Sequence, residues 1–302
     1  MDLLHALERS AKLASTSKVK RMLAHPGKYL EALLHRKLFY ANTHKARAAT
    51  AQTFYGAKLN ILLPAATDIY LTGAKSHPTE LRLAKFLIKN LKEGDVFIDI
   101  GAHYGYFSLL AESLVGGKGW VYSIEASKGT FILLQQNVWQ SERVKPFHLA
   151  ISDEPGTISF YEFPVFYSEY NSTDIEQFKD KHWFKKNVPG KIAVKATSLD
   201  AFIAENNITP AMIKIDVEGA EVKVIRGGLH YFRENNPLVI MEYLQPSRQN
   251  HQHRQAAQLM YDSGFESFTI SDDGSLQKCS DIDGWLREQH LDSDNIVFKK
   301  ST

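Results

Sequence analysis

Hydrophobic and polar positions follow two alternating periods over most of the chain. Residues 79–91 carry apolar side chains at helical spacing, whereas residues 96–100 form a short, nearly continuous apolar run that predicts a buried strand. Six further strands are predicted over residues 120–124, 144–151, 212–217, 238–243, 265–270 and 295–298. Helical patterns lie between many of them, over residues 104–115, 130–139, 222–232 and 251–262. This alternation predicts an α/β fold with a mostly parallel, seven-stranded sheet and helices on both faces.

The alternation lapses in the middle of the chain. Residues 157–163 predict an extra strand, and residues 166–190 are aromatic and polar without a clear period. A loop of this length in a compact domain is more often functional than idle. Its aromatic side chains could shape a substrate pocket or could simply pack in the core. They include Tyr167, Tyr170, Trp183 and Phe184.

The residues before this alternation predict a separate N-terminal region. Leucine and alanine at helical spacing predict two helices within residues 1–47. Short apolar runs around Gly56, together with residues 69–71, predict a small strand pair. We therefore divide the chain into an N-terminal extension, residues 1–75, and a main domain, residues 76–302.

Charge distinguishes the extension from the rest of the chain. Residues 1–50 contain ten Lys and Arg residues but three acidic residues, a net charge of +7, whereas the remainder carries −5 and the whole chain +2. A helical extension that packs on the main domain is the simpler interpretation. Docking on a membrane surface, on a partner or on a second copy of the chain is the alternative. The nearly neutral total argues against nucleic acid as a partner.

Other features of the composition exclude whole classes of function. The single cysteine, Cys279, excludes an internal disulfide and a multi-cysteine zinc site. No apolar run approaches the roughly 20 residues that span a bilayer. Asp2 and Glu8 interrupt the apolar stretch that a signal peptide needs, so we expect a cytoplasmic protein. His251 and His253 begin a predicted helix, where exposure to solvent is a simpler interpretation than a metal site.

The strongest candidate for a ligand site is the turn after the strand at residues 96–100. Asp99 lies in this strand, and Gly101, Tyr104 and Gly105 lie in the turn that precedes a predicted helix. Glycine lets backbone pass close to a ligand, and ligands of open parallel sheets bind beyond the carboxyl ends of the strands. A plain strand-to-helix turn is the structural alternative. Because a buried acid is costly unless it is used, Asp99 favours a binding role.

This turn lacks the glycines of two common nucleotide sites. His103 and Tyr106 stand where a dinucleotide fingerprint needs glycine, and the chain has no Gly-x-x-x-x-Gly-Lys-Ser/Thr loop for phosphates. A nicotinamide oxidoreductase is therefore disfavoured, although it stays an alternative. A ligand that offers an amine, a carboxylate and a ribose but no phosphate fits an acidic turn better. S-adenosylmethionine is such a ligand.

Two further strand ends carry acids that could complete a nucleotide site. Glu125 ends the second strand, 20 residues after Gly105, and Ala126 follows it. A carboxylate at this position can accept hydrogen bonds from both ribose hydroxyls. Ser152 and Asp153 follow the third strand, where Asp153 could accept a hydrogen bond from the amine of adenine. Both acids could also be solvated residues of ordinary turns.

Three carboxylates mark the ends of two later strands. Asp216 and Glu218 are two residues apart, so their side chains lean to the same face, and Glu242 ends the next strand. If these strands are neighbours, the acids share one rim, where they could act as a general base or bind a divalent cation. A shared site raises one pKa, which suits a base near neutral pH. Capping of the following helix by Glu218 and Glu221 is the structural alternative.

Six ordered stretches of the main domain resemble the FkbM family of S-adenosylmethionine-dependent methyltransferases. They are Val-Phe-Ile-Asp-Ile-Gly-Ala-His-Tyr-Gly-Tyr (96–106), Tyr-Ser-Ile-Glu-Ala-Ser (122–127), Ala-Ile-Ser-Asp-Glu-Pro-Gly (150–156), Thr-Ser-Leu-Asp (197–200), Ile-Lys-Ile-Asp-Val-Glu-Gly-Ala-Glu (213–221) and residues 237–242. The resemblance implies the seven-stranded, Rossmann-like sheet of class I methyltransferases. It implies O-methylation of a sugar, polysaccharide or polyketide hydroxyl. It also implies that Asp99 and Gly101 line the methionine side, that Glu125 holds the ribose and that Asp153 faces adenine.

The interpretation that follows is an S-adenosylmethionine-dependent O-methyltransferase with a small-molecule or glycan acceptor. Glu218, Asp216 or Glu242 would remove the proton of the acceptor hydroxyl. His103, at a position where the family often has Asn, is a further candidate base. A divalent cation could bind but is not expected, and no residue is assigned to a metal. A cation-dependent small-molecule O-methyltransferase and a non-catalytic cofactor-binding module stay as alternatives.

Overall fold

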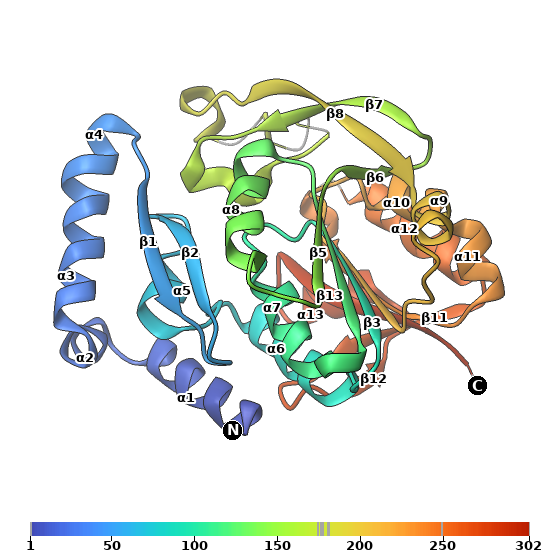
Figure 1. Ribbon diagram of the computed structural model, residues 1–302, viewed down its shortest axis with the longest axis horizontal. Coiled ribbons are helices and arrows are strands. Elements are labelled where there is room, and N and C mark those ends of the chain that lie inside the picture. Colours follow the sequence, from blue (N-terminus) through green and yellow to red (C-terminus); the bar gives the residue numbers. More distant parts are fainter. Residues whose placement is uncertain (1, 174, 176–177, 180–181, 249, 302) are drawn as a thin grey trace.

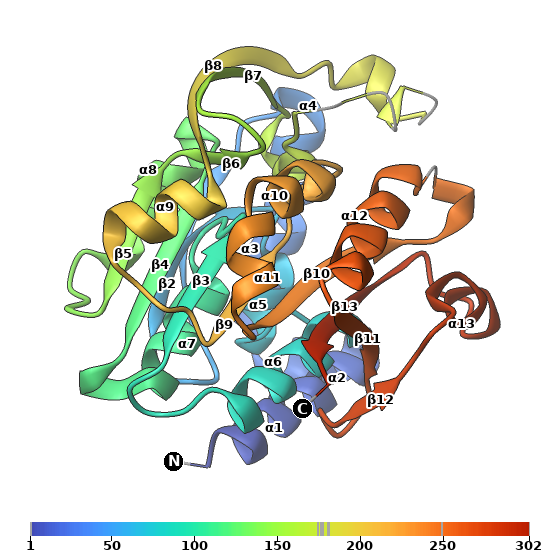
Figure 2. The same ribbon diagram turned by 90° about the vertical axis from the view of Figure 1, so that its right-hand side faces the viewer.

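An eight-stranded sheet runs through the middle of the structure, a computed structural model that describes residues 2–173, 175, 178–179, 182–248 and 250–301. The strands follow the order β12-β11-β13-β10-β9-β3-β4-β5, and Figure 2 shows them spread in this order across the molecule. The five neighbouring strands β10, β9, β3, β4 and β5 are parallel to one another. β13 runs antiparallel between β10 and β11. The bounds are β3 Val96–Ile100, β4 Trp120–Glu125, β5 Val144–His148, β9 Met212–Ile215, β10 Leu238–Leu244, β11 Phe265–Ile270, β12 Leu276–Lys278 and β13 Ser293–Lys300.

Helices cover both faces of this sheet, so the predicted α/β fold is confirmed. Successive side chains of a strand point to opposite faces, and accordingly Phe97 packs in one layer and Ile98 in the other. Burial on both faces explains the continuous apolar runs of the parallel strands. The first layer holds α6 (Pro78–Asn90), α7 (Tyr106–Val115) and α8 (Lys128–Val138). The second holds α9 (Leu199–Asn206), α10 (Glu221–Gly227), α11 (Leu229–Glu234), α12 (His251–Asp262) and α13 (Ile282–Glu288).

The predicted number of strands is one too small. β12 pairs antiparallel with β11 and adds an eighth strand at the edge of the sheet. This strand has three residues, of which Leu276 alone is apolar, so it leaves no hydrophobic pattern in the sequence. The seven expected strands carry most of the sheet, and the addition does not touch the strand ends that were predicted to hold a ligand.

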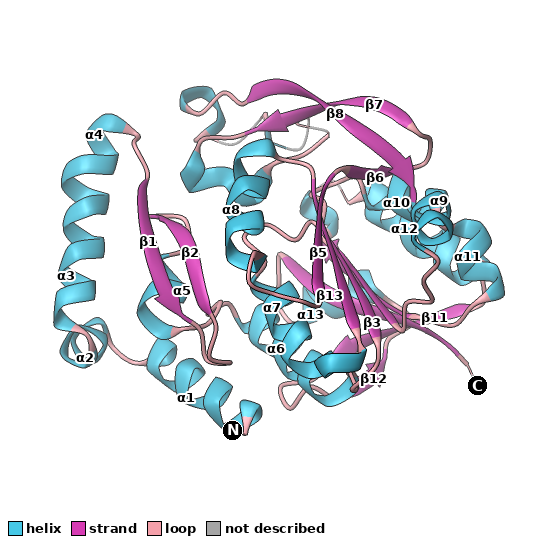
Figure 3. Ribbon diagram, viewed as in Figure 1, coloured by secondary structure: helices cyan, strands magenta, loops and turns pink. Residues whose placement is uncertain are grey.

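One predicted strand is in fact two strands in different sheets. Residues 144–151 divide into β5, at the edge of the central sheet, and β6 (Ala150–Ser152). β6 pairs with β8 (Gly190–Ser198), which also pairs with β7 (Gly156–Glu162), the extra strand that the sequence predicts. Figure 3 shows β7 and β8 along the top of the molecule, apart from the central sheet. The apolar run continues across the break at Leu149, so its pattern could not reveal the change of sheet.

The N-terminal region contains more helices than predicted. A further short helix follows the first one, because Ser17 caps a new helical segment after α1. Residues 69–71 are helical rather than extended, and their helix ends at Gly73, whose φ is +77°. The strand pair is an antiparallel hairpin that begins at Arg47, earlier than expected. The elements are α1 (Leu3–Ser15), α2 (Lys18–Ala24), α3 (Pro26–Leu34), a π-helical segment (His35–Tyr40), α4 (Ala41–Thr43), β1 (Arg47–Gln52), β2 (Lys58–Leu63) and α5 (Thr67–Thr72).

The first helix fastens this region to the main domain. Leu7 of α1 is fully buried and belongs to the same core as Leu83 of α6. Figure 1 shows α3 at the outer edge of the molecule, with β1 and β2 between it and the central sheet. The division at residue 75 stays a prediction. Within the described part of the chain, no helix has both the length and the apolar character to cross a membrane.

Candidate active site

A cavity of about 370 Å³ lies at the carboxyl ends of β3, β4, β9 and β10. β3 and β9 are neighbours although they are far apart in sequence, so the cavity opens where the strand order reverses. Its remaining walls come from the loop before α6, from β13 and from the 3₁₀ segment Val165–Tyr170. Five of the residues singled out in the sequence therefore line one cavity, together with residues from segments that the sequence did not connect to it: Gly101, Glu125, Asp216, Glu218 and Glu242.

Gly101 lets the turn after β3 pass against the end of β9. Its φ is +80°, and a Cβ atom there would lie 1.8 Å from the carbonyl oxygen of Asp216, so no larger residue fits. The N–H groups of Gly101 and Ala102 donate to the carbonyl of Ile124 at 2.9 and 3.0 Å, which ties the turn to β4. Gly101 lines the cavity, whereas Gly105 begins α7 against α8 and does not.

Glu125 stands at the end of β4 and is held by backbone donors. Its Oε2 atom accepts a hydrogen bond from the N–H of His103 at 2.9 Å, and its Oε1 atom accepts one from the N–H of Ser127 at 2.8 Å. Burial raises the pKa of this carboxyl to about 7, against the lowering effect of the two hydrogen bonds. Glu125 and Ala126 both line the cavity, in the place that the sequence predicts for a ribose-binding residue.

Asp99 lies behind the cavity wall rather than in it. It is fully buried, and it accepts a hydrogen bond from the Ser108 hydroxyl at 2.7 Å. The Nζ atom of Lys214 lies 3.4 Å from Asp99 and 3.1 Å from Asp216. Asp99 is not among the residues that line the cavity, whereas its partner Lys214 is, and the role of Asp99 on the methionine side stays a prediction. Lys214 was missed, although a lysine in a buried apolar strand was a usable signal.

Ser152 and Asp153, the predicted adenine-side residues, do not line the cavity either. Asp153 accepts a hydrogen bond from Ser152 at 3.0 Å and forms an ion pair with Arg226 at 3.3 Å. Because the chain leaves the central sheet after β5, these residues lie at the end of β6 in the smaller sheet. Residues 149–151 supply the cavity wall at this place instead.

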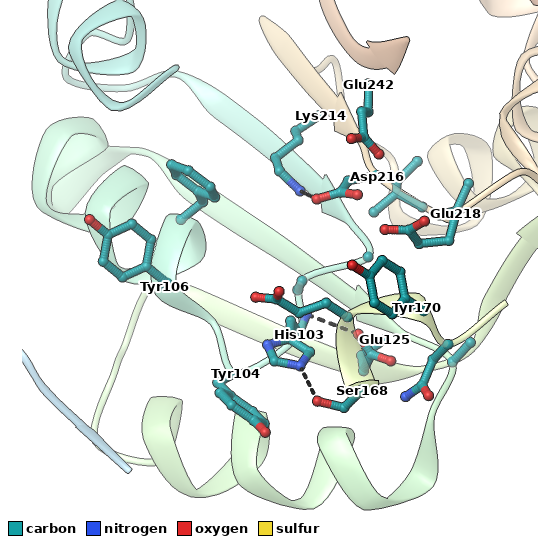
Figure 4. A pocket seen from close by; sticks show the side chains of 18 of the residues that line it. His103, Tyr104, Tyr106, Glu125, Ser168, Tyr170, Lys214, Asp216, Glu218 and Glu242 are labelled. Atoms are coloured by element: carbon teal, nitrogen blue, oxygen red, sulfur yellow. Dashed lines mark hydrogen bonds and ion pairs between the residues drawn. The ribbon is translucent and has the colours of Figure 1, made fainter. Parts of the chain in front are cut away.

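Asp216, Glu218 and Glu242 gather at one side of the cavity. One carboxylate oxygen of each lies within 4.8 Å of those of the other two. β9 and β10 are parallel neighbours, and Met241 pairs with Ile215, which brings the residues that follow them together. Figure 4 shows the three acids and Lys214 close to one another, with Glu125 apart from them. The acids that the sequence placed on a common rim therefore do share one.

The protonation of these three acids differs because their surroundings differ. Burial, followed by the charge of Glu242, raises the pKa of Glu218 well above its ordinary value. Burial, followed by the charge of Asp216, raises the pKa of Glu242 to about 8. Burial opposes ionisation of Asp216 too, but the Lys214 ammonium outweighs it and lowers that pKa. The group therefore combines one ionised carboxylate with two that titrate late, an arrangement suited to accepting a proton near neutral pH.

Glu218 is carried by a turn that Glu221 and His253 hold. Glu218 has a φ of +51°, in the left-handed region. The Oε1 atom of the fully buried Glu221 accepts hydrogen bonds from the N–H groups of Val217 and Gly219 at 3.3 and 3.2 Å. Its Oε2 atom lies 3.3 Å from Nε2 of His253. The expectation that His253 is solvated is wrong: it is 2% exposed, because the start of α12 packs on α10.

His103 is poorly suited to act as a base. Its ring centroid lies 3.8 Å from that of Tyr104, and its Nε2 atom lies 3.2 Å from the hydroxyl of Ser168. Burial and the charge of Lys75 lower its pKa to about 3, so the ring stays neutral. A group with this pKa is a weak proton acceptor, so the surroundings of His103 favour it less as a base than the three acids. Both rings line the cavity.

A second cation enters the site from a region that sequence reasoning did not consider. Lys75, in the loop before α6, lies 3.2 Å from Glu80 and lines the cavity together with Glu169. Burial opposes its charge, but these two carboxylates and Asp216 raise its pKa well above the ordinary value. Burial raises the pKa of Glu169. No local pattern could have brought Lys75 and Glu169 together, because they lie in segments that are far apart in the sequence.

The aromatic residues of the segment 166–190 mostly pack on one another. The rings of Tyr167 and Trp183 stack with centroids 4.4 Å apart, and those of Tyr170 and Trp183 with centroids 5.3 Å apart. Tyr170 lines the cavity, whereas Tyr167, Trp183 and Phe184 do not. One of the four predicted rings therefore lines the cavity, and the other three pack against neighbouring rings. A role for this segment in shaping the acceptor pocket stays a prediction. The expectation also covered residues 174, 176–177 and 180–181, which lie outside the described residues.

Known proteins resemble the part of the chain that builds this cavity. A family model described as a methyltransferase FkbM domain matches residues 99–267, more than half of the 302 residues. The chain is 25% identical over 166 residues to the hexuronic acid methyltransferase AglP of Haloferax volcanii, a match that covers 53% of this chain and 61% of that protein. It is 27% identical over 153 residues to a probable cobalt-precorrin-6B C(15)-methyltransferase (decarboxylating) of Saccharolobus solfataricus, with 49% and 75% covered. A solved FkbM methyltransferase from Methylobacillus flagellatus aligns with a TM-score of 0.43 at 13% identity, over 78% of this chain and 52% of that one.

Proposed function

The chain belongs to the FkbM methyltransferase family, and we propose that it transfers a methyl group from S-adenosylmethionine to a hydroxyl group of a sugar-like acceptor. The observation that carries this proposal is that one cavity has two differently built walls. The donor wall consists of the Gly101 turn and Glu125, and its carboxylate is held by backbone N–H groups. The acceptor wall consists of Asp216, Glu218 and Glu242. The first suits a ribose and the second suits removal of a proton.

The donor wall fits a cationic nucleoside that has no phosphates. Glu125 can accept hydrogen bonds from ribose hydroxyls, and the Gly101 turn presents bare backbone to a ligand. Seven carboxyl groups and three lysines or arginines line the cavity, and a positive ligand would favour the ionised form of those carboxyls whose pKa values burial raises. The carboxylates belong to Asp68, Glu80, Glu125, Glu169, Asp216, Glu218 and Glu242, and the cations to Lys75, Lys214 and Arg248. S-adenosylmethionine would supply a methyl group activated by its sulfonium.

The acceptor wall would remove the proton of the attacking hydroxyl. An aliphatic hydroxyl is a weak nucleophile until its proton leaves, and the most effective base has a pKa near the working pH. Glu218 and Glu242 have raised pKa values, whereas Asp216 is kept ionised by Lys214. We take Glu218 as the first candidate base. The relative from Haloferax volcanii is a hexuronic acid methyltransferase, which supports a sugar hydroxyl as the acceptor class for this chain.

The Glu218→Gln variant tests this assignment. It should cut turnover by roughly 10²–10⁴-fold, because the amide cannot take the proton. Donor affinity, measured by calorimetry with S-adenosylmethionine, should stay near that of the unaltered protein. Turnover is measured by transfer of a labelled methyl group to a panel of sugars, with the exposed Glu154→Gln as the matched control. Unchanged turnover in the Glu218 variant would exclude this residue as the base.

A second candidate is favoured by the closeness of the three acids. Carboxylate oxygens within 4.8 Å of one another could hold a divalent cation that lowers the pKa of the acceptor hydroxyl. Activity that survives a chelator excludes this mechanism, and activity that is lost with the chelator and restored by Mg²⁺ supports it. Donor binding without transfer to any acceptor would favour a non-catalytic module. Binding of NAD but not of S-adenosylmethionine would favour an oxidoreductase.

A further inference from the structure

Large hydrophobic side chains are exposed together on the N-terminal face, which we define as residues 18–39. Eight such side chains lie on this face, and three more lie elsewhere in the described part of the chain. Scattered exposed leucines are ordinary, but a gathered set marks a contact surface. The eight are Val19, Met22, Leu23, Leu30, Leu33, Leu34, Leu38 and Phe39; the other three are Ile132, Trp139 and Val188.

The exposure follows from how the helices of this face pack. Ala32, His35 and Tyr40 turn inward and are buried. Leu30, Leu34 and Leu38 recur at intervals of four residues along α3 and the π-helical segment, so they form a stripe on the outer side. Figure 1 shows α2 and α3 at the edge of the molecule, away from the central sheet. This helical segment therefore has a buried apolar side and a second apolar side whose leucines, Leu30, Leu34 and Leu38, are 55%, 42% and 58% exposed.

The same face is strongly basic. Residues 18–39 contain six Lys and Arg residues and one acidic residue, Glu31, a net charge of +5. Glu31 is already engaged, since it accepts a hydrogen bond from the Tyr70 hydroxyl and pairs with Arg47. The six cations are Lys18, Lys20, Arg21, Lys28, Arg36 and Lys37. The surface thus offers apolar side chains and uncompensated positive charge together.

We propose that the N-terminal face docks on an anionic membrane surface. Exposed leucines can enter the boundary between headgroups and acyl chains while the neighbouring lysines and arginines meet anionic headgroups. A second copy of the chain fits less well, because a symmetric contact would bring one +5 surface against another. Nucleic acid would use the cations but leave the leucines exposed. The proposal does not depend on the proposed methyl transfer.

Docking would also orient the cavity. The Tyr40 hydroxyl, at the end of the face, accepts a hydrogen bond from the N–H of Phe166 at 3.2 Å. The guanidinium of Arg36 lies 5.4 Å from the centre of the Phe166 ring. Phe166 belongs to the same short segment as Ser168 and Tyr170, which line the cavity. The face and the cavity are therefore joined by direct contacts.

Co-sedimentation of the full chain with vesicles tests the proposal. The protein should bind vesicles of phosphatidylcholine mixed with phosphatidylserine, bind phosphatidylcholine alone weakly, and dissociate at high salt. The Leu23→Asp/Leu38→Asp variant should bind at least about tenfold more weakly, since both side chains would be buried in the bilayer boundary. Leu23 and Leu38 are 71% and 58% exposed, and circular dichroism should confirm that the variant folds. The matched control is Trp139→Asp/Val188→Asp, at positions 73% and 69% exposed outside the face.

Several results would overturn the proposal. Failure of the unaltered protein to bind anionic vesicles would do so, as would equal binding to both kinds of vesicle. Equal loss of binding in the control variant would show that the N-terminal face is not the docking surface. A dimer in light scattering that the Leu23→Asp/Leu38→Asp variant abolishes, without any binding to vesicles, would assign the face to a second copy. Binding to labelled RNA with no binding to vesicles would assign it to nucleic acid.

Discussion

Glu125 and Glu218 face the same cavity, but they are held there by different kinds of contact. Glu125 is fixed by two backbone N–H donors, next to the Gly101 turn, where no larger residue fits. Glu218 belongs to a group whose protonation depends on burial and on the charges around it, above all that of Glu242. Backbone hydrogen bonds determine where a carboxylate lies, whereas burial and neighbouring charges determine whether it carries a proton. The difference supports the proposed division of roles, in which the donor wall binds the cofactor and the acceptor wall takes a proton.

The largest expected effect concerns the backbone of the donor wall. In Gly101→Ala the new Cβ atom would meet the Asp216 carbonyl at 1.8 Å, in a backbone conformation that alanine rarely adopts. We expect a loss of about 3 kcal/mol or more in the free energy of unfolding, or no folded protein at all. Urea titration measures it. Gly129→Ala is the control, since a Cβ atom there meets nothing within 4 Å and α8 should gain stability. Similar stabilities for the two variants would contradict the tight turn.

Both walls should make the stability of the ligand-free protein depend on pH. The pKa values of Glu125 and Glu242 are raised from 4.5 to about 7 and about 8, so the folded state binds protons that the unfolded chain has released. Proton binding by these two residues contributes fully to the free energy of unfolding below about pH 4.5, and this contribution is lost as the pH rises toward 8. Urea titrations across this range should show a fall on the order of 1–3 kcal/mol. Glu125→Gln and Glu242→Gln should each reduce the slope, and a stability that rises over the range would refute the assignment.

A smaller effect, on turnover, is expected from substitution of His253, which lies behind the acceptor wall. In His253→Gln the buried Glu221 loses the imidazole that lies 3.3 Å from its Oε2 atom, so Glu221 should hold the turn that carries Glu218 less firmly. We expect turnover to fall roughly tenfold, because small displacements of a base are costly. Donor affinity, read by calorimetry, should not change, and the exposed His230→Gln is the control. A variant that loses donor affinity as much as turnover would point to a general structural role for His253.

The smallest effect is expected at Asp153, which is paired with Arg226 outside the cavity wall. Asp153→Asn should change the affinity for S-adenosylmethionine by less than about twofold, since surface ion pairs contribute little. Glu125→Gln, measured in the same calorimeter, should weaken binding far more. A large loss of affinity in the Asp153 variant would instead support the placement of this residue beside adenine, as the family resemblance implied.

The donor wall was largely predictable from the sequence, and the reason is that its signals are local. The strand at residues 96–100, the Gly101 turn and Glu125 lie within two consecutive strand-and-turn units, where period and spacing carry the information. The acids of the acceptor wall were also found, because the ends of parallel neighbouring strands must meet. The pattern does not show which way a side chain points. It therefore could not reveal that Asp99 is buried behind the cavity wall.

The rest of the site depends on contacts between distant segments. Lys75 comes from a loop before α6, and Glu169 comes from the segment after β7. His253 is buried because α12 packs on α10, although its own neighbours in the sequence are polar. Such contacts follow from tertiary packing, which leaves no period in the chain. The N-terminal charge, by contrast, was visible at once, yet only the structure shows that leucines share its surface.

The break at Leu149 has a consequence for how such an enzyme can change over evolution. β6, β7 and β8 form their own hydrogen-bonded sheet, and the segment 166–190 is a long excursion from it that returns into β8. Residues could be inserted, deleted or exchanged in this excursion without shifting the register of any strand in the central sheet. If this excursion helps to select the acceptor, acceptor choice could then change during evolution while the central sheet and the donor site keep their structure.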